Sequence, residues 1–245
     1  MIVRMKRRPV RALLLAAALA GCWSLTRPAI TRQGVNFRVT EHAVPQYAKA
    51  VDFLRRDGEY RALAAQIVQG LHTDRERALA VFEWTRGHIR PIPQGWPVVD
   101  DHVWHIIIRG YGTDDQMADV FTTLCAYAGV PSYWRFLRHP ETGAVLTVSL
   151  ARLNGRWAVF DVQHDAMFQD AQGGWLTPQE LAADPALSHV ADRARVLAQA
   201  PYPAYFADPA FLALPPSPLR PELQMPGPRL AYEARRALHL AGVAQ

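Results

Sequence analysis

One stretch, residues 111–131, constrains the fold of this chain most, because it carries the start signal, the apolar face and the stop signal of a single helix. Thr113 is followed three residues later by Gln116, which predicts a capping box. Asp114 and Asp115 then fall in the first turn, where carboxylates suit the positive end of the helix dipole. We therefore expect a central helix whose first turn is directed toward a candidate site.

The same stretch predicts that this helix is buried and ends sharply. Gly129 can adopt the left-handed conformation that follows a helix end, and Pro131 prevents continuation. The apolar residues follow the i, i+3, i+4 spacing of one helix face; they are Met117, Val120, Phe121, Leu124, Cys125 and Ala128. Because Cys125 lies on this face, we interpret it as a small buried hydrophobic residue and not as a nucleophile.

A strand hairpin is predicted after the helix. Residues 132–138 and 144–153 are strand-like, and Asn154-Gly155 is a strong two-residue turn signal. In that register Val148 faces Asp161 directly, and Leu146 lies one diagonal step away on the same face. An unpaired buried carboxylate is costly, so we expect Asp161 to be paired or protonated. Its candidate partners are His164, His139 and Arg135.

This order of parts resembles the transglutaminase-like superfamily, whose fold is that of papain-like cysteine proteases. In that family a Gly-x-Cys turn opens a central helix that ends in Gly-Ile-Pro. A strand carrying His follows, and a later strand ends in Trp and Asp. The corresponding segments here are Gly112-Thr113-Asp114, Gly129-Val130-Pro131, Leu146-Thr147-Val148 and Trp157 to Asp161. The resemblance covers residues 78–165 and implies an α+β fold, with the central helix packed on an antiparallel sheet.

The resemblance also implies a Cys–His–Asp site, of which only the Asp is present. Asp114 stands at the nucleophile position, Leu146 at the His position and Asp161 at the Asp position. An ionised carboxylate is not a nucleophile comparable to a thiolate for acyl transfer, and Leu146 can neither accept nor deliver a proton. We therefore interpret the chain as a degenerate member of the family, a pseudoenzyme with no intact catalytic set and no cofactor.

Two further interpretations remain open. Asp114, ionised by the helix dipole, and Asp161, buried, could act as general base and general acid in an envelope hydrolase that cleaves glycan. Alternatively, the cleft that corresponds to the active site of the family, or the Pro-rich tail, could bind the chain to an envelope assembly. The sequence favours a binding or scaffolding component and does not identify its ligand, which could be peptidoglycan, another envelope polysaccharide or a protein.

Residues 98–109 contain a candidate metal-binding group. On a helix His102 and His105 would share a face, and Asp101 would lie four residues before His105. Zinc sites commonly require three or four protein ligands, and no obvious third and fourth ligand is present. We therefore expect no metal in this segment.

The N-terminus predicts a bacterial lipoprotein signal over residues 1–21. Five basic residues precede the apolar run 12–20, which is too short to span a bilayer. The sequence Leu19-Ala20-Gly21-Cys22 matches a lipobox, so we expect cleavage before Cys22 and lipidation of its thiol. Trp23 is not the Asp associated with retention in the inner membrane. This favours the outer membrane, facing the periplasm, if the host is Gram-negative.

Removal of this segment changes the charge balance. The whole chain has 27 Lys and Arg against 22 Asp and Glu. The signal holds five of the basic residues and no acidic one, so the expected mature chain is neutral. The high pI is therefore no indication of nucleic-acid binding, and we expect a membrane anchor and no nucleic-acid partner. Cys125 would remain as the free thiol.

The expected organisation is a signal (1–21), a tether (22–40), the transglutaminase-like domain with N-terminal helices (41–170) and a C-terminal extension that packs on it (171–245). Two helices, 47–56 and 60–71, are separated by Asp57-Gly58, and Thr73 with Glu76 caps a third. In the extension Thr177 caps another helix, 188–200 is helical, 201–228 is irregular or polyproline structure, and 229–240 is a final helix.

Overall fold

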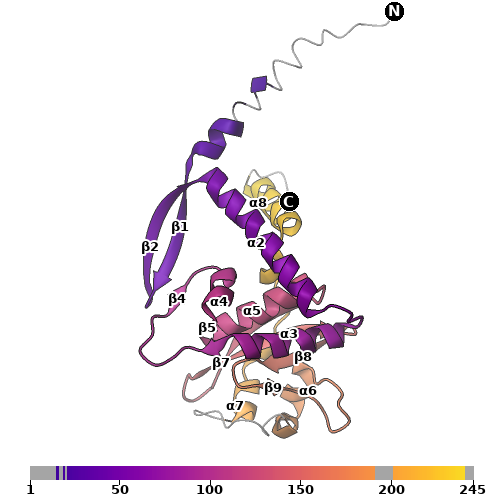
Figure 1. Cartoon of the computed structure of the whole chain (residues 1–245). Helices are drawn as coiled ribbons and strands as arrows, with labels where there is room; N and C mark the ends of the chain where they lie inside the picture. Colours follow the sequence, from indigo (N-terminus) through magenta and orange to yellow (C-terminus); the bar gives the residue numbers. More distant parts are fainter. Residues whose placement is uncertain (1–14, 17–18, 20, 191–200, 241–245) are drawn as a thin grey trace, which may run out of the picture.

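The computed structural model describes residues 15–16, 19, 21–190 and 201–240. It has an α+β core, with a long N-terminal helix and a hairpin above it (Figure 1). Most of the predicted signal segment and most of the predicted helix 188–200 lie outside the described residues. Within them, no helix is both long enough and apolar enough to cross a bilayer.

The central helix is confirmed as α5 (Asp114–Tyr127), with most of its residues buried. At its start the side-chain oxygen of Gln116 accepts the Thr113 N–H at 3.3 Å, as in a capping box. Asp115 Oδ1 also accepts bonds there, from the Thr113 hydroxyl at 2.5 Å and from the Gln116 N–H at 3.0 Å. Gly129 ends the helix with φ +84°, the left-handed conformation predicted for it.

The predicted hairpin is also confirmed. The main sheet is antiparallel, with the order β6 (Ser132–Arg138), β7 (Val145–Leu153), β8 (Arg156–Asp161) and β9 (Ala166–Met167). Asn154 and Gly155 both have positive φ, as a type I′ turn requires. Ser149 pairs with Phe160, so the next step of the register sets Val148 opposite Asp161.

The two faces of this sheet are covered by different parts of the chain. One face packs on α5 and on α3 (Asp74–His88), with Ala151, Leu153 and Phe160 in that cluster. The other face packs on the C-terminal extension, with Leu146, Val148, Leu150 and Val159 in that cluster. The sheet is therefore buried on both sides.

The two helices predicted over 47–56 and 60–71 are wrong, because the structure has one helix, α2 (Gln46–Ile67). Gly58 costs only about 1 kcal/mol in a helix interior. Contacts on both sides of it offset that cost: Asp57 receives Arg61 Nε at 2.9 Å and the hydroxyl of Tyr127 in α5 at 2.8 Å. The next helix, α3, has the predicted capping box between Thr73 and Glu76.

An unpredicted hairpin precedes α2. β1 (Pro28–Val35) and β2 (Arg38–Pro45) are antiparallel, and β1 also pairs with β4 (Val99–Asp100). The hairpin crosses residue 40, the boundary expected between tether and domain. Its turn residues Asn36 and Phe37 have positive φ, and Phe37 is largely exposed.

Short elements lead into α5. The helix predicted over 98–109 is shorter than expected, since α4 spans Val103–Arg109 and residues 99–100 form β4. β5 (Tyr111–Gly112) then pairs in parallel with β3 (Arg90–Pro91). This pairing sets the Pro91 segment beside the turn that opens α5.

The C-terminal extension packs against the sheet and is more helical than expected. Its elements are α6 (Pro178–Ala183), η1 (Pro185–Val190), α7 (Tyr202–Phe206), η2 (Pro209–Leu212), η3 (Arg220–Gln224) and α8 (Pro226–Leu240). Thr177 caps α6 as predicted. The prediction of irregular or polyproline structure over 201–228 is wrong where these turns form, because buried aromatic residues hold short helical turns against the sheet.

Candidate functional site

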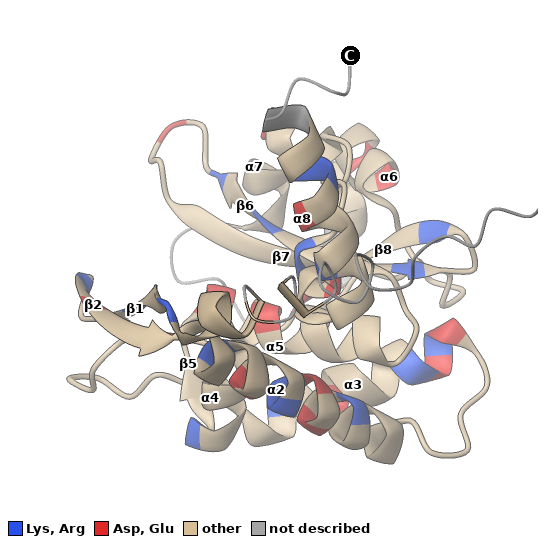
Figure 2. Ribbon diagram, turned by 90° about the horizontal axis from the view of Figure 1, so that it is seen from above, with Lys and Arg blue, Asp and Glu red and all other residues tan. Residues whose placement is uncertain are grey.

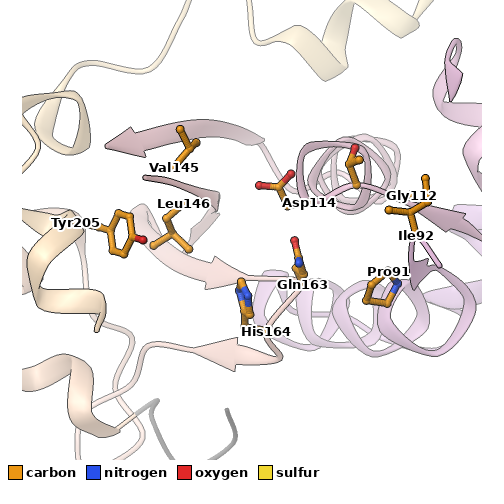
Figure 3. A pocket seen from close by; sticks show the side chains of 10 residues that line it. Pro91, Ile92, Gly112, Asp114, Val145, Leu146, Gln163, His164 and Tyr205 are labelled. Carbon is orange, nitrogen blue, oxygen red and sulfur yellow. The ribbon is translucent and has the colours of Figure 1, made fainter. Parts of the chain in front are cut away.

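A cleft of about 400 Å³ opens where the start of α5 meets the edge of the sheet. Figure 3 shows side chains from both sides pointing into it. The helix side supplies Gly112 and Asp114, and the sheet side supplies Leu146 of β7 with Gln163 and His164 after β8. Tyr205 closes one wall from α7 in the extension. Two of the three family-equivalent positions, Asp114 and Leu146, therefore line one cavity.

Asp114 is the first residue of α5 and is tied to the sheet. Its Oδ2 accepts a hydrogen bond from the Thr147 hydroxyl at 2.5 Å. The turn before it requires glycine, because a Cβ at Gly112 would lie 2.9 Å from the Cβ of Gln116. The N-terminal end of α5 and the Thr147 hydroxyl both offer hydrogen-bond donors at this position.

Asp161, the third position, is buried and hydrogen-bonded. Its side chain receives the His164 backbone N–H at 3.1 Å and His164 Nδ1 at 2.8 Å. The Tyr202 hydroxyl donates to the same carboxylate at 3.1 Å. The prediction that Asp161 is paired is confirmed. His164 is the partner that lines the cleft, whereas Asp161 itself is 1% exposed.

The other two candidate partners of Asp161, Arg135 and His139, form hydrogen bonds with other groups. Arg135 donates to the backbone carbonyls of Ala210 and Ala213 in the extension. His139 Nδ1 accepts backbone N–H groups of its own turn, from Glu141 and Thr142. Both therefore organise local or extension contacts.

The thiol of Cys125 is far from the cleft. It lies eleven residues after Asp114, about 16 Å along α5, and is fully buried. Burial raises the pKa of this thiol well above its ordinary value. Its interpretation as a buried hydrophobic residue is confirmed.

Sequence reasoning missed Thr147, Gln163, Tyr202 and Tyr205. Thr147 and Gln163 are each two residues or fewer from a position that had been identified, Leu146 or Asp161, so their proximity was a usable signal. Tyr202 and Tyr205 lie some 40 residues after Asp161, and only the aromatic content of the extension indicated that this segment packs.

The group considered for metal binding supports the start of α5 instead. Asp101 contacts both His105 and Arg109, and Arg109 reaches Gln116 Oε1 at 3.3 Å. Burial, with smaller effects of Arg56 and His105, lowers the pKa of His102 to about 4. Across the described residues, no three His, Cys, Asp or Glu side chains converge in a group able to hold a metal ion.

Charges of both signs are interspersed over the described surface. Figure 2 shows Lys and Arg beside Asp and Glu on several helices, and acidic residues at the start of α5. Long-range electrostatic attraction of a charged ligand requires a surface patch in which charges of one sign are gathered. Within the described residues, Asp114 is the carboxylate that lines the cleft.

Comparisons with known proteins identify the family. No curated protein matches the chain. Similar solved structures include a candidate cysteine protease from Cytophaga hutchinsonii (16% identity, TM-score 0.37, 43% of this chain and 37% of that one). Others are a candidate protease from Parabacteroides distasonis (12%, 0.36, 54% and 35%) and a TGase (12%, 0.30, 66% and 49%).

The chain thus spans less than half the length of each of these structures. The sequence model of the transglutaminase-like superfamily matches residues 61–176, the segment that contains α3, α5, the β7–β8 hairpin and the helix and sheet sides of the cleft. Residues 61–176, with their central helix on an antiparallel sheet, are thus a segment of the transglutaminase-like superfamily.

Proposed function

We propose that this chain is a lipid-anchored envelope protein that binds a ligand in its transglutaminase-like cleft and does not carry out cysteine-dependent acyl transfer. The observation that carries the proposal is the residue at the start of α5. Asp114 occupies the nucleophile position and is hydrogen-bonded to Thr147. Covalent acyl transfer in this family needs a thiolate and a base, and Leu146 stands where that base would be.

Retention of the cleft supports a binding role. Its walls combine apolar side chains, such as Leu146 and Ile92, with the polar groups of Asp114, Gln163 and His164. A concave site with a few convergent polar groups is the usual form of a ligand site. The ligand classes that fit an envelope location are peptidoglycan, another envelope polysaccharide or a partner protein.

The anchor is the second part of the proposal. Cys22 is exposed, and residues 21–26 are helical and lead into the hairpin. Lipidation of Cys22 would hold the domain at the membrane, with the outer membrane facing the periplasm as the destination in a Gram-negative host. Mass spectrometry of membrane-extracted protein tests this, and an unmodified Cys22 would contradict it.

Glycan hydrolysis by Asp114 and Asp161 as a direct carboxylate pair has less support. Both oxygens of Asp161 accept hydrogen bonds, and the residue is buried behind a histidine. A general acid must reach the leaving group in the cleft.

Acyl transfer and ligand binding should be measured on the same preparations. The variants are Asp114→Ala and Asp161→Ala, with Glu83→Ala, an exposed carboxylate on α3, as the matched control. We expect capture of envelope glycan or protein by wild type and no transamidation or proteolysis by any preparation. Transamidation that a thiol reagent abolishes would overturn the proposal.

A further inference from the structure

We propose that α8, the last helix of the extension, lies on the surface of an anionic lipid bilayer and limits the orientations of the domain against the membrane. This role goes beyond the proposed function and rests on it only in placing the chain at a membrane. The headgroup region of the bilayer is the occupant of a helix face that the described residues leave uncovered.

α8 divides into an apolar face and a basic face. An α-helix makes a turn in about 3.6 residues, so side chains three, four, seven or eight positions apart share a face. Arg229, Arg235 and Arg236 fall outside the apolar face of α8, together with Glu233. This is the pattern of a helix that lies in the plane of a membrane interface. The apolar face consists of Leu230, Ala231, Ala234, Ala237 and Leu238.

No described part of the chain buries this apolar face. Leu230 is 70% exposed and Leu238 is 50% exposed, and the three alanines are exposed as well. Among the described elements, α8 packs mainly on η3, which directly precedes it. An isolated helix of about 15 residues is marginal in water, because helices in proteins gain most of their stability from burying an apolar face. α8 therefore gains stability from a further surface.

The charges of α8 favour an anionic surface over a second copy of the same helix. Residues 226–238 contain three Arg and one Glu, which gives a net charge of +2. Glu233 is paired with Arg229 at 2.8 Å and with Arg236 at 3.8 Å. A second copy would bring the same positive charge to the contact, whereas the phosphate groups of anionic lipids complement it.

Two of the arginines line a groove beside the apolar face. A cavity of about 550 Å³ lies between α8 and the turn that leads into η3, and Arg235 and Arg236 line its helix side. Glu222 lines the other side, and its carboxylate accepts the Leu219 N–H at 3.1 Å. Ala231 belongs both to this groove and to the apolar face. Because guanidinium groups bind phosphate oxygens well, a lipid headgroup fits the groove while its acyl chains contact the leucines.

The position of α8 suits a membrane contact near the predicted anchor. Figure 1 shows α8 above the core, on the side of the molecule from which the N-terminal segment leaves. Cys22, the predicted lipidation site, belongs to that segment, within the helical residues 21–26. An anchor in the same membrane raises the effective concentration of bilayer at α8, so that a weak contact can form. Two contacts restrict rotation of the domain more than one does.

A fluorophore on the apolar face tests whether α8 enters the bilayer. Ala234→Cys puts a thiol in the middle of that face. The full chain, purified from membranes, is labelled with nitrobenzoxadiazole and added to vesicles of phosphatidylcholine, with or without phosphatidylglycerol. We expect the emission to shift to shorter wavelength, and to shift more with phosphatidylglycerol. The parent chain, with Cys22 and Cys125, gives the background. No shift with either lipid would overturn the proposal.

Tyr232→Cys is the matched label position. Tyr232 is exposed and comes two residues before Ala234, so it lies nearly opposite on the same helix. We expect its label to stay in water. A shift at Tyr232 without one at Ala234 would overturn the assignment of the face.

Substitutions in the Ala234→Cys chain test which groups hold α8 at the surface. Leu230→Ala with Leu238→Ala should lower the equilibrium constant for entry by at least about tenfold, because buried methyl and methylene groups are lost. Arg235→Gln should lower it by about fivefold in low salt and much less in high salt. Leu214→Ala is the control, at an exposed leucine outside α8. An unchanged constant for both α8 variants would contradict the proposal.

Flotation of the vesicles separates this proposal from the proposed anchor. If the chain floats with the vesicles while the Ala234 label stays in water, the role of α8 fails and the anchor stands. If Cys22 is unmodified but the label shifts with phosphatidylglycerol, the anchor fails and the role of α8 stands. A shift that depends on protein concentration and not on lipid would show that copies of the chain cover the face, and would overturn the proposal.

Discussion

The two faces of the β6–β9 sheet differ in the part of the chain that buries them. The face toward α5 is covered by side chains from residues 60–130, nearly all within the segment that matches the superfamily. The opposite face is covered by residues 166–219, and most of these follow that segment. Tyr202, Tyr205, Phe206, Phe211 and Leu219 are all buried there.

The C-terminal extension is therefore part of the candidate site as well as of the fold. It supplies the Tyr202 hydroxyl to Asp161 and the Tyr205 ring to the cleft wall. Arg135 on β6 is in turn held by carbonyls of the extension. A fragment limited to residues 61–176 would therefore lack the Tyr202 hydrogen bond to Asp161 and the Tyr205 wall of the cleft.

Removal of the extension should have the largest effect. A buried aromatic ring removes about 150–250 Å² from water, worth about 4–6 kcal/mol at 25 cal/mol per Å². Tyr202, Phe206 and Phe211 together therefore match or exceed the total stability of a typical domain. We expect a chain truncated before residue 201 to be insoluble or unfolded by circular dichroism.

Deletion of residues 28–45 is the comparison for that truncation. The β1–β2 hairpin is largely exposed, and it joins the core through β4 and the start of α2. We expect this deletion to lower the melting temperature far less than truncation of the extension. Equal losses would show that the second sheet face does not depend on the extension.

Single truncations of side chains compare the two faces directly. Phe121→Ala removes a ring that packs on Phe82 and Phe160, and Phe211→Ala removes a ring stacked on Phe206. Each should lower the free energy of unfolding by about 3–5 kcal/mol in urea denaturation. Because one sheet joins both clusters, both variants should unfold in a single transition. A separate early transition for Phe211→Ala would divide the molecule into two units.

A pH effect should appear at the junction between α5 and the extension. Burial raises the pKa of Asp119 to about 6, and Arg220 and the Trp134 N–H only partly oppose this. Because the pKa of Asp119 is higher in the folded than in the unfolded state, its protonated form stabilises the fold. This contribution is complete below pH 3.8 and is lost as the pH rises through about 6. Wild type should therefore lose stability relative to Asp119→Asn between pH 4 and 7, by at most about 3 kcal/mol.

Thermal melts of the two proteins at a series of pH values check this prediction. Asp119→Asn is neutral throughout and keeps an acceptor for Trp134. If the difference in stability between wild type and Asp119→Asn did not change with pH, Asp119 would have the same pKa in the folded and unfolded states, and the prediction would be wrong.

The smallest effect is expected from one hydroxyl. Tyr202→Phe keeps the ring in the cluster and removes the bond to Asp161. The loss should be about 1 kcal/mol in stability, because the carboxylate keeps its two bonds to His164. Tyr47→Phe, at an exposed position on α2, is the control. If Tyr202→Phe lowered the free energy of unfolding as much as Phe211→Ala, the Tyr202 hydroxyl would stabilise more of the structure than Asp161 alone.

The features that could be predicted from sequence are those fixed by neighbouring residues. Thr73 with Glu76, Gly129 with Pro131, and Asn154 with Gly155 each specify a local conformation, and all three formed. The position of Asp161 opposite Val148 followed because a two-residue turn sets the register of both strands.

The features that could not be predicted depend on contacts between distant segments. The Asp57-Gly58 pair looked like a break, but Asp57 bonds to Tyr127, 70 residues away, and α2 continues. The helical turns of the extension form because their aromatic rings pack against one face of the sheet. Arg135 could not be excluded as the partner of Asp161 from sequence, because the carbonyls that it contacts, those of Ala210 and Ala213, lie in the extension.

The contact between Asp161 and His164 spans three residues of one turn, whereas the family places its histidine on the neighbouring strand. A contact across two strands is lost when the hairpin between them gains or loses a residue. A contact within one turn moves as a unit and is indifferent to such changes. The Asp161–His164 contact therefore does not depend on the length of the β7–β8 hairpin, and Leu146 on β7 takes no part in it.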